Sequence, residues 1–410
     1  MNPVRIGVIG CGNIARGLHL PVIAALSDYL ELVAVCDQNE SLARETAATY
    51  GVAHCTRAED LLAQDLAVCD LEAVAILTYA SNHHGVGRMA AQAGKHMVVE
   101  KPIAITLPCA DVLLRACEQA GVLLQVMENY PFMPDDALVN RLARSGALGE
   151  IAAVYVCDDL NGMSLDIGVH RFAQVRAPVA AEPRRVTADL RRSPFGRPEP
   201  EVNERSFGDP LSDYWGRALV EFANGALGVC ECFPLGRAAP VWAPDYRRVL
   251  GTEGVLTDSL WPNIFPPLPS GEVHLHRWES GSWREIPIER ITAQGALEQL
   301  VARTEPPVIW ENPFRDCRFR SLGVEWASPA SLEMWLIAEA ELYAGFARAI
   351  REGAALPYPG ALGRLDLEMC IATYESARRG GPVELPLREI TPHEEAIHQA
   401  YRERYGRDAL

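Results

Sequence analysis

Over the first 128 residues, short apolar runs alternate with segments whose apolar residues recur every three or four positions. The runs at 4–10 and 30–37 predict strands, and the segment 13–27 between them predicts a helix that Pro21 breaks or kinks. Such alternation indicates a parallel sheet with helices on both faces. The further predicted strands are residues 73–79, 96–100 and 122–128, and the further predicted helices are residues 41–51, 85–94 and 109–121.

After residue 129 the pattern changes to consecutive runs of alternating apolar and polar residues. Asn224-Gly225 and Gly281-Ser282 are hairpin signals between such runs, so we expect a mainly antiparallel sheet. Residues 262–330 give no secure assignment. The predicted strands lie within residues 151–157, 184–191, 216–233, 246–260 and 272–288, and the helices expected to cover the sheet are residues 135–146, 330–352 and 364–380.

A chain of 410 residues is too long for one ordinary core, and the change of pattern places a domain boundary between residues 128 and 129. The sequence therefore predicts an α/β protein. Its N-terminal domain, 1–128, has a parallel sheet, and its C-terminal α+β domain, 129–395, has an open, mainly antiparallel sheet. Residues 396–410 are expected to form a C-terminal tail.

Composition and net charge indicate which classes of binding partner are unfavourable for this chain. Lys plus Arg number 38 and Asp plus Glu number 54, which gives a formal charge of −16 and disfavours nucleic acids and anionic membranes as partners. The start of the chain reads as a strand and not as a leader, and no apolar stretch approaches the length of a membrane span. Eleven cysteines are scattered without a framework, so we expect reduced thiols and a cytoplasmic location.

Gly10-x-Gly12-x-x-Ala15 directly follows the first predicted strand and opens the first helix. Glycines punctuate any tight turn, but this context matches a dinucleotide-binding loop. Gly10 permits the turn, Gly12 lets the backbone approach a pyrophosphate, and Ala15 allows close helix packing. Asn13 and Ile14 belong to the same loop and are expected to contact the cofactor. No Gly-Lys-Ser/Thr follows, so the loop is not a P-loop.

Asp37 ends the second predicted strand, at the interval where a carboxylate accepts hydrogen bonds from the adenosine ribose. The 2′-phosphate of NADP would face this negative charge, and the following residues contain no arginine to offset it. The sequence therefore favours NAD over NADP. The alternative is that Asp37 only caps the next helix.

Asp166 and His170 are four residues apart, which on a helix places both side chains on one face. A carboxylate near an imidazole orients the ring and suits it as a base near neutral pH. Alcohol oxidation by NAD needs such a base, together with a cation that stabilises the developing alkoxide. Lys101, between Glu100 and Pro102 at a strand end, is the cation we expect. The alternatives are a surface Asp–His pair and an ordinary surface lysine.

These segments together resemble the Gfo/Idh/MocA oxidoreductases, the family of glucose–fructose oxidoreductase and inositol dehydrogenase. The resemblance covers most of the chain, and Glu-Lys-Pro in its setting is the most specific part. The matching segments, in chain order, are GVIGCGNIA, AVAILTYASNHH, AGKHMVVEKPIAIT, SGALGEI, LDIGVH, FANGALGV, VLGTEGVL and ARRGGPVELPL.

The resemblance implies a Rossmann domain that binds NAD(P), followed by a domain whose open sheet serves dimer or tetramer contacts. It places Lys101 beside the nicotinamide and the reacting hydroxyl, in a cleft between the domains. It makes His170 the acid/base and gives Asp166 a binding or orienting role. Glu100 would be structural or contact the cofactor, and Pro102 would fix the chain after the lysine, with a cis bond as one way to do so.

The chain departs from the family pattern in three places. Thr78-Tyr79 stands where relatives usually have Thr-Pro, so the loop on the nicotinamide side, with Thr78 as a cofactor contact, is expected to differ. His83 matches the family's loop histidine and is assigned to the cofactor site in a mainly structural role, while His84 is an additional titratable group. Ala173 stands where relatives often have an acidic residue, a departure that concerns substrate orientation and not the hydride step.

The expected substrate is a sugar or polyol, and its polar contacts are expected from Asn129, Tyr130 and Tyr246. No metal site is expected, because His274 and His276 lack a third ligand at suitable spacing. The predicted function is therefore that of an NAD-dependent sugar or polyol dehydrogenase. One alternative enzyme retains NAD for a transient 3-keto-sugar step in elimination, epimerisation or glycoside cleavage. The alternative of another class is a catalytically silent NAD-binding regulator.

Overall fold

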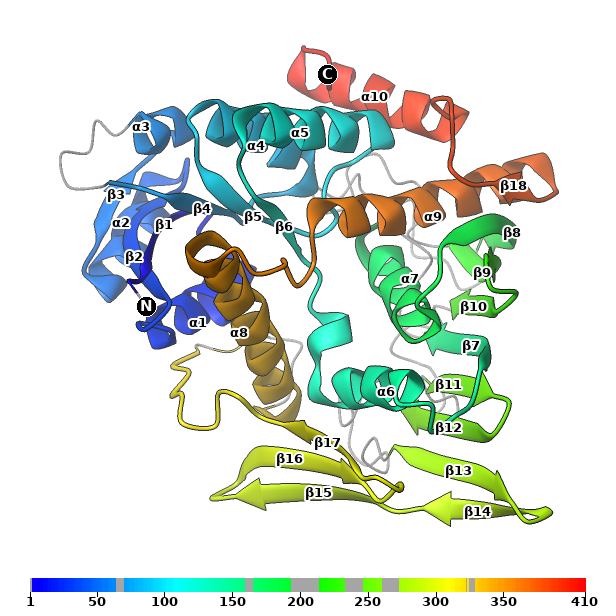
Figure 1. Cartoon of the computed structure of the whole chain (residues 1–410). Helices are drawn as coiled ribbons and strands as arrows, with labels where there is room; N and C mark the ends of the chain where they lie inside the picture. Colours follow the sequence, from blue (N-terminus) through cyan, green and yellow to red (C-terminus); the bar gives the residue numbers. More distant parts are fainter. Residues whose placement is uncertain are drawn as a thin grey trace. The chain divides into compact units, whose positions relative to one another are not determined.

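The computed structural model describes residues 2–63, 70–158, 165–192, 214–232, 246–259, 273–321, 323 and 329–410 (Figure 1). The chain forms two compact units that alternate along the sequence. The first unit comprises Met1–Asn129, Asp316–Leu367 and His398–Leu410. The second comprises Tyr130–Arg315 and Glu368–Ile397.

The first unit is built on a six-stranded sheet in the order β3-β2-β1-β4-β5-β6, in which every pairing is parallel. Helices α4 and α5 pack side by side on one face, and α1 lies on the other (Figure 1). This is the predicted doubly wound sheet. Its strands are β1 Val4–Ile9, β2 Leu30–Cys36, β3 Ala53–Cys55, β4 Ala73–Ile76, β5 His96–Glu100 and β6 Leu124–Met127, and its helices are α1 Leu20–Ala25, α2 Glu40–Tyr50, α3 Ala58–Leu62, α4 Ala80–Gln92 and α5 Leu107–Ala120.

The predicted helix 13–27 forms in two pieces, a π-helical segment η1 (Ala15–His19) and then α1. Pro21 lies in the first turn of α1, where a missing N–H group costs little. The backbone stays right-handed helical from η1 through Leu20 into α1, so the expected break at Pro21 does not occur and the helix changes type just before that residue. His19 lies at the end of η1, fully buried.

The second unit contains a nine-stranded sheet in the order β14-β13-β12-β11-β7-β10-β9-β8-β18. Its pairings are antiparallel except for β7 with β10, which confirms the mainly antiparallel prediction. Both hairpin signals form turns, at Gly225 and Gly281. The strands are β7 Ile151–Asp158, β8 Pro183–Arg192, β9 Tyr214–Phe222, β10 Leu227–Cys232, β11 Tyr246–Gly251, β12 Gly254–Ser259, β13 His274–Glu279, β14 Ser282–Ile286 and β18 Val383–Glu384.

Helix α7 (Leu165–Val179) packs on β7 and β10 and carries Asp166 and His170. A Cβ at Gly228 on β10 would lie 2.2 Å from Val175 of α7, so the close approach of helix and strand requires glycine there. The short helix η2 (Tyr130–Phe132) and α6 (Pro134–Arg144) also contact α7. The stretch left unassigned includes a three-stranded antiparallel sheet of β15 Ile288–Ala293, β16 Ala296–Ala302 and β17 Val308–Glu311.

Helix α8 (Pro329–Glu352) packs against η1, α1, β1 and β6 of the first unit. The prediction that residues 330–352 cover the antiparallel sheet is therefore wrong. Periodicity shows that a helix buries one face but does not identify the surface against which that face is buried.

The end of the chain also belongs to the first unit. Helix α10 (Pro392–Tyr405) follows α9 (Gly360–Arg379) and β18, and residues from 398 onward pack on α4 and α5. His398 Nε2 lies 2.8 Å from Thr106 Oγ1, and the Ala409 carbonyl accepts a hydrogen bond from His84 Nε2 at 2.5 Å. None of the helices in the described ranges has the length and apolar character needed to cross a membrane.

Candidate functional site

The predicted nucleotide loop follows β1. The backbone after β4 packs against Gly10 of this loop, whereas no atoms lie close to Gly12. Gly10 has a φ of +101°, and a Cβ there would lie 2.6 Å from the Leu77 carbonyl oxygen, so the turn requires glycine. A Cβ at Gly12 would meet nothing within 4 Å. Ala15 is fully buried, Ile14 is half-buried, and Asn13 is exposed and accepts a hydrogen bond from Arg16. The loop thus has the open backbone face that a pyrophosphate needs.

Asp37 joins this loop to the start of α2. Its Oδ2 accepts a hydrogen bond from the Cys11 N–H at 2.8 Å, and its Oδ1 accepts one from the Asn39 N–H at 2.8 Å. The side chain that caps α2 is Asn39, which accepts from the Leu42 N–H at 3.2 Å. Asp37 is therefore not the cap of that helix, and its half-buried carboxylate is fixed beside the glycine turn.

Strand β5 ends at Glu100, and the following Lys101–Pro102 peptide bond is cis. The Lys101 N–H donates to Glu100 Oε2 at 2.9 Å, while His19 Nε2 donates to Glu100 Oε1 at 2.8 Å. Burial alone would raise the pKa of Glu100, but the hydrogen bond and charge of His19 outweigh it and lower that pKa. Glu100 is therefore held as a carboxylate that links Lys101 to the interior of the unit.

His83 lies between the loop after β4 and the loop after β5. Its Nδ1 is 2.8 Å from the Pro102 carbonyl oxygen and its Nε2 is 3.0 Å from the Thr78 carbonyl oxygen. Burial lowers the pKa of His83, while the hydrogen bonds to the Pro102 and Thr78 carbonyls act in the opposite direction. The geometry supports a structural role that ties the Thr78 and Lys101 loops together.

Tyr79 and His84, on either side of this region, differ in exposure: Tyr79 is exposed and His84 is buried. Tyr79, where relatives usually have proline, is 45% exposed, and its carbonyl accepts a hydrogen bond from Thr78 Oγ1 at 3.3 Å. His84, the additional titratable group, is buried with its ring against Tyr401 and the C-terminal residues, and burial lowers its pKa to about 4. His84 therefore contributes to packing of the chain end.

In the second unit, α7 presents Asp166 and His170 one turn apart, as the spacing predicted. The His170 ring stacks on Tyr130 with centroids 4.0 Å apart and an interplanar angle of 21°. The Arg171 guanidinium lies 5.4 Å from the centroid of the same Tyr130 ring. Tyr130 and His170 are each 5% exposed, so the imidazole is held in a fixed, largely dry setting.

The other two predicted substrate residues have different surroundings. Asn129 is 8% exposed, and its Nδ2 donates to Glu339 Oε1 at 2.8 Å within the first unit. Tyr246 is half-buried at the start of β11, next to Arg247, which is 1% exposed and ion-paired to Asp136 and Asp258. This ion-pair network fixes the strand that carries Tyr246.

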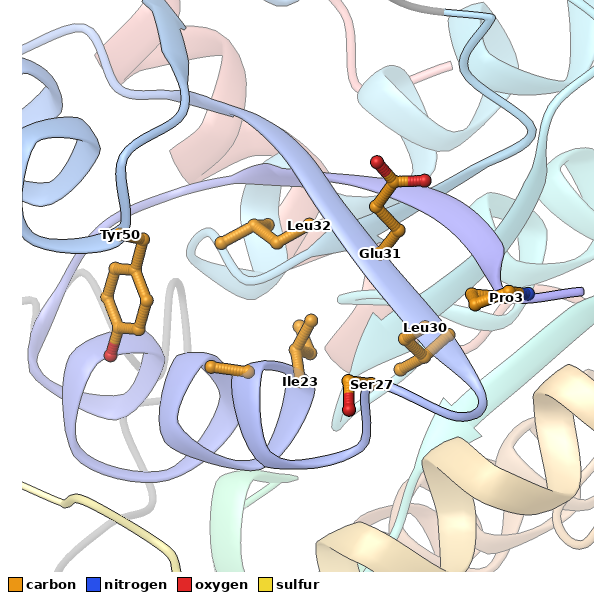
Figure 2. Close-up of a pocket in the computed structure, with 8 residues that line it drawn as sticks. Pro3, Ile23, Ser27, Leu30, Glu31, Leu32 and Tyr50 are labelled. Carbon is orange, nitrogen blue, oxygen red and sulfur yellow. The ribbon is translucent and has the colours of Figure 1, made fainter.

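A pocket of about 440 Å³ opens at the amino end of β2 (Figure 2). Asp37 and the glycine turn follow the carboxyl ends of their strands, at the other edge of the sheet. Dinucleotides bind at the carboxyl edge of parallel sheets, so this pocket is not the cofactor site. It is lined by Pro3, Ile23, Ala24, Ser27, Leu30, Glu31, Leu32 and Tyr50.

One cluster of potential metal ligands occurs among the described residues: His19, Glu100 and Glu339, whose ligand atoms lie within 4.8 Å of one another. Both ring nitrogens of His19 already have hydrogen-bond partners, Glu100 on one side and Tyr343 on the other. We therefore interpret the cluster as a hydrogen-bonded network. His19 and Glu339 were not predicted from the sequence. The available signal was the pair of glutamates, Glu339 and Glu341, in the otherwise apolar stretch of α8.

Residues 4–128 match the model of an oxidoreductase family with an NAD-binding Rossmann fold. The chain is 37% identical over 142 residues to a D-apiose dehydrogenase of Paraburkholderia graminis, covering 35% of this chain and 36% of that protein. It is 27% identical over 255 residues to a D-glucoside 3-dehydrogenase of Escherichia coli, covering 55% and 69%. The D-apiose dehydrogenase is thus matched over little more than a third of its length.

The fold as a whole is shared with solved structures. An oxidoreductase from Agrobacterium radiobacter, crystallised with NAD+, L-tartaric acid and magnesium, superposes with a TM-score of 0.66 at 18% identity. The superposition covers 93% of this chain and 98% of that one. At this identity the likeness establishes the fold alone, a parallel sheet followed by a mainly antiparallel one.

Proposed function

We propose that this chain is an NAD-dependent dehydrogenase of sugars or polyols in the Gfo/Idh/MocA oxidoreductase family, whose model its residues 4–128 match. The reaction is oxidation of a secondary hydroxyl on a sugar, glycoside or polyol. The names of the curated relatives, a D-apiose dehydrogenase and a D-glucoside 3-dehydrogenase, support this substrate class.

One observation carries the proposal. The glycine turn follows β1, Thr78 follows β4 and Lys101 follows β5, and these three strands are neighbours in one parallel sheet. Their carboxyl ends share one edge, the edge at which dinucleotides bind in this fold. A lysine at that edge, on a backbone fixed by Glu100, is suited to act on a group next to the nicotinamide.

The residues divide the chemistry between them. NAD, when bound, accepts the hydride from the substrate carbon. The Lys101 ammonium donates to the reacting oxygen and stabilises its developing negative charge. His170 takes the hydroxyl proton, Asp166 orients the ring or the substrate, and stacking on Tyr130 limits how far the imidazole can turn. Asn129 and Tyr246 are assigned to the substrate's remaining hydroxyls.

An enzyme that retains NAD for a transient 3-keto-sugar step would use the same residues. A transient ketone acidifies the neighbouring C–H, which permits elimination, epimerisation or glycoside cleavage before the ketone is reduced again. A silent NAD-binding regulator would have no need for a proton-transfer set. The presence of Lys101, Asp166 and His170 therefore favours an enzyme.

We also propose that the enzyme prefers NAD to NADP because of Asp37. A substitution at Asp37 tests this preference. Removing the carboxylate in Asp37→Ala removes the repulsion of a 2′-phosphate, so the ratio of NAD to NADP affinity is expected to fall by about tenfold, or about 1.4 kcal/mol. Titration of wild type and variant with NADH and NADPH, followed by cofactor fluorescence, measures the ratio. Glu45→Ala, on an exposed face of α2, is the matched control. An unchanged ratio in Asp37→Ala would remove Asp37 from the ribose site.

A substrate screen tests the reaction itself. Purified protein is mixed with NAD and a panel of sugars, glycosides and polyols, and absorbance of the reduced cofactor is followed. Release of bound nucleotide on denaturation shows in parallel whether NAD is retained. We expect sustained reduction with at least one compound, or retained nucleotide that one of them reduces.

We propose a cytoplasmic location and assembly as a homodimer or homotetramer. The eleven cysteines are scattered along the sequence without a disulfide framework, which supports a reducing compartment. Gel filtration with light scattering measures the oligomeric state.

A further inference from the structure

His19 is a fully buried imidazole with an acidic group facing each ring nitrogen. Its Nε2 lies 2.8 Å from Glu100 Oε1. Its Nδ1 lies 2.9 Å from the Tyr343 hydroxyl and 3.7 Å from Glu339 Oε2. All four residues belong to the first unit, in which η1, β5 and α8 bring them together.

Glu339 is a carboxylate with no exposed surface. Its Oε1 accepts the Asn129 hydrogen bond, while its buried Oε2 has no hydrogen-bond partner and faces His19 Nδ1. A buried ionised carboxylate is costly unless a cation or a proton compensates it. Burial raises the pKa of Glu339 to about 7.

The charges around His19 favour its protonation. Burial by itself would lower the pKa of His19, but the carboxylates of Glu339 and Glu100 more than compensate and raise it. The charge of Glu339, whose Oε2 lies 3.7 Å from His19 Nδ1, thus favours the protonated ring. Among the described residues, Glu100, Glu128 after β6 and Tyr343 on α8 interact with this pair, and Lys101 and His83 of α4 interact with Glu100.

We propose that His19 and Glu339 form a buried proton-holding pair that positions Glu100 and, through it, Lys101. Both act as positioning residues for the dehydrogenase reaction, so the inference rests on the proposed function. The imidazolium holds Glu100 ionised through Nε2–H, and the other oxygen of Glu100 holds the Lys101 N–H. Glu339 holds the proton on His19 from the opposite side of the ring.

The sign of the pH dependence follows from this arrangement. The folded-state pKa of His19 is raised, so the imidazolium is present at lower pH and is lost as pH rises through that value. Replacing Glu339 by glutamine removes the charge that favours the imidazolium. The pKa of His19 should then fall, and the high-pH limb of the rate profile should move to lower pH.

A spectroscopic test does not require knowledge of the substrate. The full-length protein is labelled with 15N in histidine, and imidazole signals are followed from acid to alkaline pH, with His19→Gln used to assign the His19 signals. We expect wild-type His19 to titrate above free histidine and Glu339→Gln to lower its midpoint. An unchanged midpoint in Glu339→Gln, or a wild-type midpoint below that of free histidine, overturns the proton-holding pair whether or not a substrate is found.

A kinetic test applies once the screen provides a substrate. His19→Leu should lower kcat by about 100-fold through misplacement of Lys101, with the NADH dissociation constant within about twofold of wild type. His19→Gln, which keeps a donor for Glu100, should recover part of the loss. His84→Gln is the control for loss of a buried imidazole that does not contact Glu100. If His84→Gln lowers kcat as much as His19→Leu, the positioning role is wrong.

Discussion

Replacing Lys101 with alanine is expected to lower the rate of cofactor reduction by about 100- to 1,000-fold. The variant loses the ammonium that stabilises the developing alkoxide. The glycine turn and Asp37 lie after other strands, so the dissociation constant for NADH should stay within about twofold of wild type. Single-turnover reduction of bound NAD and titration by cofactor fluorescence measure the two quantities separately.

Lys101→Arg is the matched variant, because it keeps the charge and changes the shape of the donor. It should retain more activity than Lys101→Ala and show the same NADH affinity. Near-normal turnover in Lys101→Ala would contradict the proposal that this lysine contacts the reacting oxygen. A parallel loss of NADH binding would mean that Lys101 serves the cofactor site instead.

Replacing His170 with alanine is expected to lower turnover by about 100- to 10,000-fold at pH values where the wild-type imidazole is neutral. The wild-type rate should fall as acid protonates the base, and the variant should lack this low-pH limb. The pH profile of kcat/KM for both proteins is the measurement. A variant that keeps the wild-type low-pH limb would show that another group is the base.

Two substitutions around His170 separate its chemistry from its placement. Tyr130→Leu removes the ring on which the imidazole stacks, so it should lower kcat while the low-pH limb remains. His170→Gln keeps a polar side chain of similar size but provides no base, so it should behave like His170→Ala. A fully active His170→Gln would assign His170 to substrate binding.

Most of the fold could be predicted from local patterns. The parallel sheet follows from short apolar runs separated by helical segments, and the turns at Gly225 and Gly281 follow from hairpin signals. The packing partner of α8 could not be predicted, because an apolar helix face does not specify which sheet covers it. The three-stranded sheet of β15–β17 was missed in a stretch rich in proline, tryptophan and charge.

The candidate site likewise contains residues that could be proposed from local sequence patterns and residues that only the packing of distant elements brings together. Gly10, Asp37, Lys101 and the Asp166–His170 pair could be proposed from the sequence because each stands at a strand end or on one helix face. The partners of Glu100 were not found, because His19 and Glu339 are 81 and 239 residues from Glu100 in the sequence and meet it only through packing of η1 and α8 on the sheet. The contacts of His83 with the Thr78 and Pro102 carbonyls were not foreseen from the sequence.

The central claim is that this chain transfers a hydride between NAD and a hydroxyl-bearing sugar or polyol, with Lys101 on the reacting oxygen. Rapid mixing of the NAD-loaded protein with the panel, followed by absorbance of the reduced nicotinamide within one turnover, tests it whether NAD is released or retained. We predict a burst of reduced cofactor with at least one compound, slowed by about 100-fold or more in Lys101→Ala at equal cofactor occupancy. Absence of reduction with every compound, or an equal burst in Lys101→Ala, would contradict it.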